Sequence, residues 1–133
     1  MKTIPYGLHY TDKKDLKSIE RALFSSHLTN GKFVEKFTQK LKLFLNSKNV
    51  LLTSSATSAL HLAFKAIGIK KNHVIIMPSI NFIAAYNMAS LLDAKIYLSD
   101  VDPYTGQMTP ETVEDCIKKN RIKNIYCIVN MFL

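Results

Sequence analysis

Cysteine, acidic side chains and long apolar runs are all scarce in this sequence of 133 residues. The two cysteines, Cys116 and Cys127, fall on different expected elements, so we expect neither a disulfide framework nor a metal-ligating pair. No apolar stretch approaches the roughly 20 residues of a membrane span, and residues 1–6 lack the apolar region of a secretory signal. We therefore expect a soluble, cytoplasmic protein with no metal and no membrane partner.

The shortage of acidic residues leaves a net charge of +8, from 18 Lys+Arg against 10 Asp+Glu. A charge of this sign attracts anions, including nucleotides and nucleic acids. The lysines are scattered in pairs beside apolar periodic positions, as on the solvated faces of helices or in turns. Because no recognised nucleic-acid-binding module accompanies them, we expect no nucleic-acid partner.

The apolar pattern predicts two amphipathic helices in residues 1–47 and then an alternation of short strands with helices. Strands that are apolar on both faces are typical of a parallel sheet covered by helices on both sides. The sequence therefore predicts an α/β fold with a mainly parallel sheet and helices on both faces. Four apolar runs are the expected strands: 49–52, 73–77, 94–98 and 124–129.

The stretch from Thr53 to Ser58 joins the first of these runs to a helical pattern, and five of its six residues carry hydroxyl groups before Ala59 begins the apolar spacing. Free backbone N–H groups, the positive end of a helix and hydroxyl side chains together make an anion site that suits a phosphate. The alternative is that Ser55 or Thr57 only caps the helix.

Polar residues also follow the other expected strands. Ser79 to Phe82 form a turn after the second run, Asp100 and Asp102 follow the third, and Asn130 follows the fourth. Because ligands bind at the carboxyl ends of parallel strands, we expect these groups and the hydroxyl stretch at one edge of the sheet.

Four sequence blocks, in this order, resemble the opening third of the DegT/StrS family of nucleotide-sugar aminotransferases. These are fold-type I enzymes that use pyridoxal 5′-phosphate. The resemblance covers nearly the whole chain and implies residues 1–133 of a large domain, with a helical segment at 1–47 and the start of the α/β sheet at 48–133. The blocks are Leu28–Gly31, Ser54–Ala63, Pro78–Asn87, and Asp100–Asp102 with Thr109–Glu111.

The resemblance assigns roles to individual positions. Ala56 and Thr57 match residues that hold the cofactor phosphate, with Ser55 as the neighbouring hydroxyl. Phe82 matches an aromatic residue that lies over the pyridine ring, where a flat side chain would stack and exclude water; the alternative is a core Phe. Asn130 is a weaker cofactor-site match. Three further positions match the substrate side of the site: Thr29, Gly31 and Asn81.

Some positions depart from the family pattern. Lys71, Asn72 and His73 stand where relatives often have Gly-Asp-Glu, Asp93 stands where they often have Gly, and Thr38 where they often have Glu. These positions belong mainly to expected surface loops, so they suggest neutral sequence divergence and not a loss of catalytic function.

By the same resemblance, the Schiff-base Lys and the Asp that pairs with the pyridine nitrogen lie beyond Leu133. No catalytic residue is expected in residues 1–133, and we expect this stretch alone to be inactive. The final apolar run also has no helix after it to cover it, which favours the N-terminal, incomplete part of a longer protein over a small domain that ends on an edge strand.

The expected function of the complete protein is the transfer of an amino group, from glutamate, to a nucleotide-linked keto-sugar in polysaccharide or glycan synthesis. Family members work as dimers, so a homodimer is implied. Two alternatives remain open: an inactive or regulatory remnant, and a sugar dehydratase that uses the same cofactor.

Overall fold

The computed structural model describes residue 5 and residues 7–130, and it divides into two compact units. The first unit ends at Leu52 and the second begins at Thr53. Within the described residues, no helix has the length and apolar character needed to cross a bilayer.

The first unit contains the two predicted amphipathic helices, α1 (Lys13–Leu23) and α2 (Lys32–Phe44). Asp12 caps α1, because its carboxylate accepts hydrogen bonds from the backbone N–H groups of Lys14 and Asp15. The Asp15 carboxylate in turn accepts the Asp12 N–H, which completes a capping box. Neither helix contains a buried residue.

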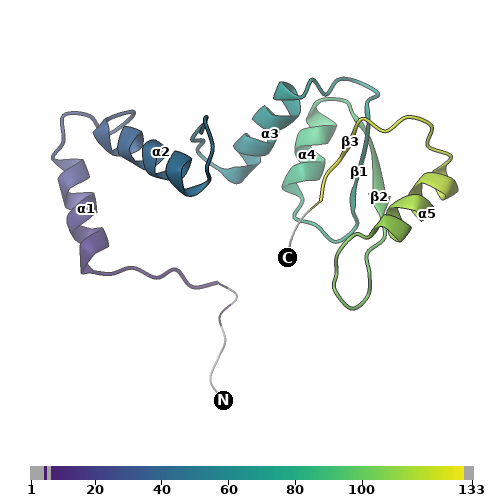
Figure 1. Cartoon of the computed structure of the whole chain (residues 1–133), viewed down its shortest axis with the longest axis horizontal. Coiled ribbons are helices and arrows are strands. Elements are labelled where there is room, and N and C mark those ends of the chain that lie inside the picture. The colour runs from purple at the N-terminus through teal and green to yellow at the C-terminus, as the bar shows by residue number, and fades with distance from the viewer. Residues whose placement is uncertain (1–4, 6, 131–133) are drawn as a thin grey trace, which may run out of the picture. The chain divides into compact units, whose positions relative to one another are not determined.

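The second unit is an α/β layer structure around three parallel strands in the order β2-β1-β3 (Figure 1). Helices α3 and α4 pack against each other on one side of the sheet, and α5 lies on the other side beside β2. This arrangement confirms the predicted parallel sheet with helices on both faces. The elements are α3 (Ala56–Ala66), β1 (Val74–Pro78), α4 (Ala84–Leu91), β2 (Lys95–Ser99), α5 (Pro110–Asn120) and β3 (Cys127–Ile128).

The core follows from strand alternation. Ile75 and Met77 of the central strand point to the face covered by α3 and α4, where they pack with Phe64, Ala85 and Ala89. All five side chains are buried, and Ile75 has no exposed surface at all. The central strand is therefore the best-protected part of the unit.

Two of the four strand predictions need correction. Residues 49–52 form no strand, although three of the four are apolar. A strand is stable only when its N–H and C=O groups pair with a neighbour, and no described strand pairs with this stretch. The predicted strand at 124–129 is shorter than expected, since β3 covers only Cys127 and Ile128.

Helix α3 runs against the direction of the strands. The Tyr126 hydroxyl donates a hydrogen bond to the carbonyl of Ile67, which is the C-cap of α3, and the Tyr126 N–H donates to Val74 at the start of β1. The end of α3 is thereby fixed near the amino ends of the strands. The helix must therefore begin toward their carboxyl ends, as α4 also does (Figure 1).

Candidate functional site

The candidate site begins at the amino end of α3. Ser55 is the N-cap, with extended backbone, and its hydroxyl accepts the N–H of Ser58 at 3.1 Å. Ser58 also lies within hydrogen-bonding distance of the hydroxyls of Ser55 (3.0 Å) and Ser54 (3.3 Å). Three serine hydroxyls therefore gather at one helix end, and no acidic residue lies in the first turn.

The first turn of α3 keeps unused hydrogen-bond donors. Within the described residues, the backbone N–H groups of Ala56 and Thr57 have no acceptor, and the Thr57 hydroxyl has no partner. The positive end of the helix dipole adds to the attraction for an anion. Capping by Ser55 therefore leaves donors available to a phosphate, so the capping and phosphate-binding interpretations are compatible.

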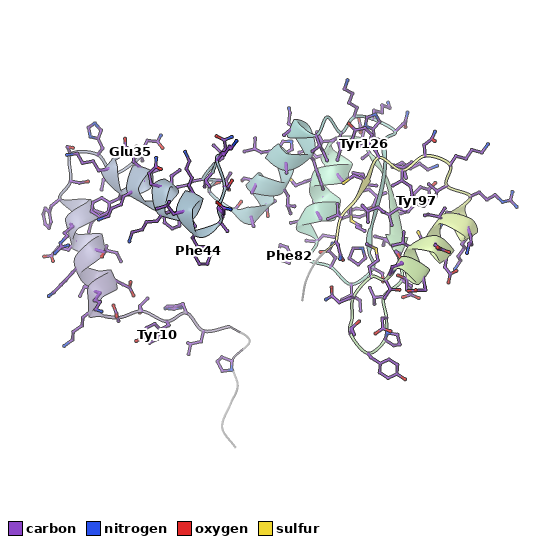
Figure 2. All side chains as sticks on the ribbon, viewed as in Figure 1. Tyr10, Glu35, Phe44, Phe82, Tyr97 and Tyr126 are labelled. Atoms are coloured by element: carbon purple, nitrogen blue, oxygen red, sulfur yellow. The ribbon has the colours of Figure 1, made fainter. Side chains whose placement is uncertain are left out.

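The turn between β1 and α4 supplies the next two residues. The Phe82 side chain is 68% exposed, so Phe82 is not a core residue of this unit and its ring is free to stack on a ligand (Figure 2). Both polar side-chain atoms of Asn81 are buried and have no hydrogen-bond partner among the described residues. A buried amide without partners costs stability, and a bound ligand would remove that cost.

Asp102 has a structural role at the end of the sheet. Its carboxylate accepts the N–H groups of Tyr104 and Thr105 and the Thr105 hydroxyl, which closes the turn after β2. The backbone N–H and then the hydroxyl of Thr105 hold the pKa of Asp102 below its ordinary value. This carboxylate is therefore occupied by its own loop.

Asn130 follows β3 and is exposed, at the same carboxyl edge of the sheet as the turn of Asn81 and Phe82. Thr29 and Gly31 lie in the first unit, before α2, whereas the α3 site belongs to the second unit. Gly31 also has a local reason to be glycine, because a Cβ there would lie 2.9 Å from the His27 carbonyl oxygen.

Sequence reasoning assigned no separate role to Ser58, which contacts two of the serine hydroxyls. Its spacing of three and four residues from Ser55 and Ser54 is the signal that places these groups on one helical face. The structure thus shows how Ser58, part of the predicted hydroxyl stretch, joins the other two serine hydroxyls.

Comparison with known proteins decides the family. The model of the DegT/DnrJ/EryC1/StrS aminotransferase family matches residues 9–132. The chain belongs to this family. It is also 34% identical over 117 residues to a UDP-4-amino-4,6-dideoxy-N-acetyl-beta-L-altrosamine transaminase of Campylobacter jejuni, a match that covers 88% of this chain and 31% of the relative.

Solved structures agree with the family fold. The Helicobacter pylori aminotransferase PseC, involved in the biosynthesis of pseudoaminic acid, gives a TM-score of 0.82 at 27% identity, over 97% of this chain and 34% of PseC. Spr1654 of Streptococcus pneumoniae, solved in a PLP form, gives 0.79 at 20% identity, over 87% of this chain and 30% of Spr1654. The chain therefore spans about a third of the length of these relatives.

Proposed function

We propose that residues 1–133 are the cofactor-phosphate-binding part of a pyridoxal-phosphate-dependent sugar aminotransferase. The main support is at the amino end of α3, where the N–H groups of Ala56 and Thr57 and the Thr57 hydroxyl have no partner in the described structure. A dianionic phosphate needs several such donors at once. Membership of the family supports the choice of pyridoxal 5′-phosphate.

The other residues fit the rest of this cofactor. The exposed ring of Phe82 offers a flat apolar surface for a pyridine ring. Beside it, on the substrate side, the buried amide of Asn81 offers both a donor and an acceptor. Asn130 supplies a further polar group at the same edge of the sheet. When bound, the cofactor supplies the electron sink for amino transfer, while these residues hold and orient it.

The substrate is proposed to be a nucleotide-linked keto-sugar, with glutamate as amino donor and Thr29, Gly31 and Asn81 on the substrate side. The named C. jejuni relative acts on a UDP-linked sugar, which supports this class. A homodimer in the cytoplasm completes the proposal. The sequence resemblance supports the amino donor and the dimer.

The test uses the longest natural polypeptide that contains this sequence. It is incubated with pyridoxal 5′-phosphate, ¹⁵N-labelled glutamate and a UDP-linked 4-keto-sugar, and the products are analysed by mass spectrometry. We expect ¹⁵N in the sugar product. Cofactor binding without nitrogen transfer would indicate the inactive remnant, and loss of a hydroxyl as water without nitrogen gain would indicate a dehydratase.

A further inference from the structure

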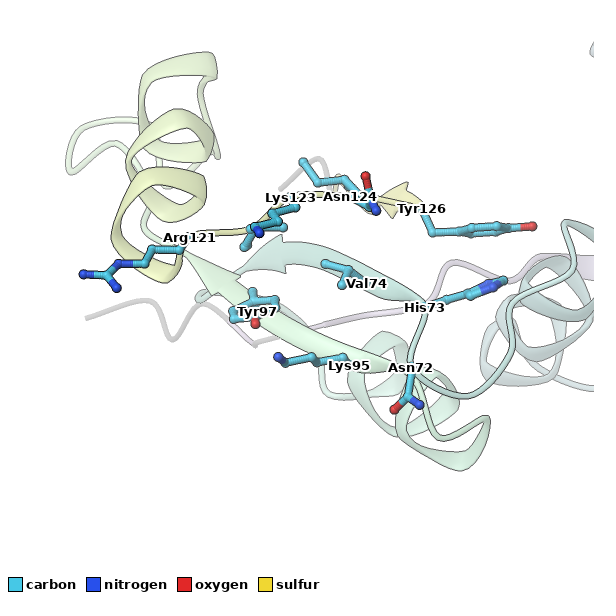
Figure 3. Close-up of a pocket in the computed structure, with 11 residues that line it drawn as sticks. Asn72, His73, Val74, Lys95, Tyr97, Arg121, Lys123, Asn124 and Tyr126 are labelled. Carbon is cyan, nitrogen blue, oxygen red and sulfur yellow. The ribbon is translucent and has the colours of Figure 1, made fainter.

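Whereas the α3 site faces the carboxyl ends of the strands, a pocket lies at the amino ends of β1 and β2 (Figure 3). Its volume is about 430 Å³, and it is formed by the starts of β1 and β2 and the segment that leads from α5 into β3. Because β1 is five residues long, its two ends are about 13 Å apart, at roughly 3.3 Å per residue. We call this the amino-end pocket. Six of the residues that line it have charged or polar side chains that could contact a ligand: Asn72, Lys95, Tyr97, Arg121, Lys123 and Asn124.

The charge of the amino-end pocket has one sign. Lys95, Arg121 and Lys123 line it, and none of the described residues that line it is acidic. Three cations with no acidic side chain among the lining residues give this pocket a positive potential that favours an anion. The carboxyl end of α5 brings partial negative charge nearby, but Lys118 and Lys119 in its last turn offset it.

Polar groups in the pocket also lack internal partners. The side-chain amides of Asn72 and Asn124 and the Tyr97 hydroxyl have no hydrogen bond to any other residue that the structure describes. The Lys95 ammonium lies 5.2 Å from the centre of the Tyr97 ring, a cation–π contact that holds this charge beside the pocket. Amide and hydroxyl donors beside fixed cations are the groups that bind phosphate oxygens.

The far wall of the pocket is held in place. The rings of His73 and Tyr126 stack with centres 4.0 Å apart, and the Tyr126 hydroxyl is fixed to Ile67 (Figure 3). Gly68 has a positive φ of 80°, and a Cβ there would lie 3.2 Å from the Tyr126 hydroxyl. The wall is therefore preorganised, which lowers the entropic cost of binding.

We propose that the amino-end pocket binds a small phosphorylated anion that carries two or more phosphate groups, as pyrophosphate and nucleoside diphosphates do. The site is separate from the cofactor site and does not depend on the proposed function. Its size suits a ligand of this class, since small-molecule pockets begin at about 300 Å³.

The test is calorimetric titration of the chain with sodium pyrophosphate at low ionic strength. The pocket variant carries Arg121→Asn and Lys123→Gln, where Asn is chosen because Arg121 has left-handed backbone, with φ 52°. The matched control carries Lys13→Gln and Lys14→Gln in α1, which removes the same net charge from outside the pocket. Far-UV circular dichroism checks that both variants stay folded.

We expect the pocket variant to weaken pyrophosphate binding by about tenfold or more and the control by less than about twofold. Equal weakening in both variants would show a net-charge effect and overturn the proposal, as would unchanged binding in the pocket variant. If the pocket variant is unfolded, Lys95→Gln alone is tested against Lys13→Gln alone, with the same criteria.

A parallel titration with adenosine diphosphate separates the two sources of the anion. If adenosine diphosphate binds more tightly than pyrophosphate, the pocket recognises a nucleotide. If it binds equally or more weakly, the pocket recognises the phosphate groups. Binding of pyridoxamine 5′-phosphate should be the same in the pocket variant and the control, because its phosphate is assigned to α3. This comparison keeps failure of the amino-end pocket distinct from failure of the cofactor site.

Discussion

Two substitutions at the amino end of α3 separate helix capping from phosphate binding. Ser55→Ala removes the hydroxyl that accepts the Ser58 N–H, so we expect the free energy of unfolding to fall by about 1 kcal/mol. Thr57→Val removes a hydroxyl that has no partner in the described structure. We expect that change to alter the free energy of unfolding by less than about 0.5 kcal/mol.

The same two variants should behave differently toward the cofactor. A hydrogen bond to a charged group contributes about 1.5–3 kcal/mol, so Thr57→Val should weaken binding of pyridoxamine 5′-phosphate by about tenfold or more. Ser55→Ala should also weaken it, but together with the loss of stability. Thr57→Val is therefore the selective variant, with reduced binding in a chain of unchanged stability.

Urea unfolding followed by circular dichroism measures stability, and equilibrium dialysis measures ligand binding. Pyridoxamine 5′-phosphate is the right probe because it cannot form an imine with the many lysines of this chain. Pyridoxamine without the phosphate is the control ligand and should bind equally to the wild type and to Thr57→Val. If Thr57→Val binds pyridoxamine 5′-phosphate as the wild type does, the reasoning is refuted.

Three further predictions test the ring contact, the core and the loop. Phe82→Ala should weaken retention of pyridoxamine 5′-phosphate in dialysis without changing stability in urea unfolding, because the side chain is 68% exposed. A large loss of stability would show that Phe82 is a core residue. Ile75→Val should lower the free energy of unfolding by about 1 kcal/mol, whereas Ile128→Val, at a site 48% exposed, should cost clearly less; equal costs would argue against the central strand as the core. The lowered pKa of Asp102 adds stability above the unfolded-state pKa near 4, and that stability is lost as pH falls through the folded-state value. Asp102→Asn should therefore reduce the fall in the free energy of unfolding as pH is lowered, measured by urea unfolding at several pH values. An equal fall in the wild type and the variant would contradict this prediction.

Local signals were enough to place most of the helices. Asp12 and Thr109 begin α1 and α5 as helix caps, with Pro110 at the first position of α5, and Gly68 follows α3 with a positive φ. Each of these features depends on a few neighbouring residues, so a local sequence pattern can indicate it. The parallel sheet followed from strands that are apolar on both faces.

Features that depend on distant residues could not be predicted in the same way. The apolar stretch 49–52 resembles a strand, but strand formation also requires a pairing partner, and local composition does not report one. The bond from Tyr126 to Ile67 joins residues 59 positions apart, and no periodicity indicates it. At the candidate site, the cap at Ser55 was accessible to sequence reasoning, whereas the unpartnered amide of Asn81 appears only in three dimensions.

The most direct test of the account is an amide nuclear magnetic resonance titration of the ¹⁵N-labelled chain with pyridoxamine 5′-phosphate. The account predicts that the N–H signals of Ala56 and Thr57 shift downfield as both groups donate to the phosphate, and that pyridoxamine alone leaves them in place. Binding that leaves both signals unmoved, or shifts that appear equally with pyridoxamine, would contradict a phosphate site at the amino end of α3.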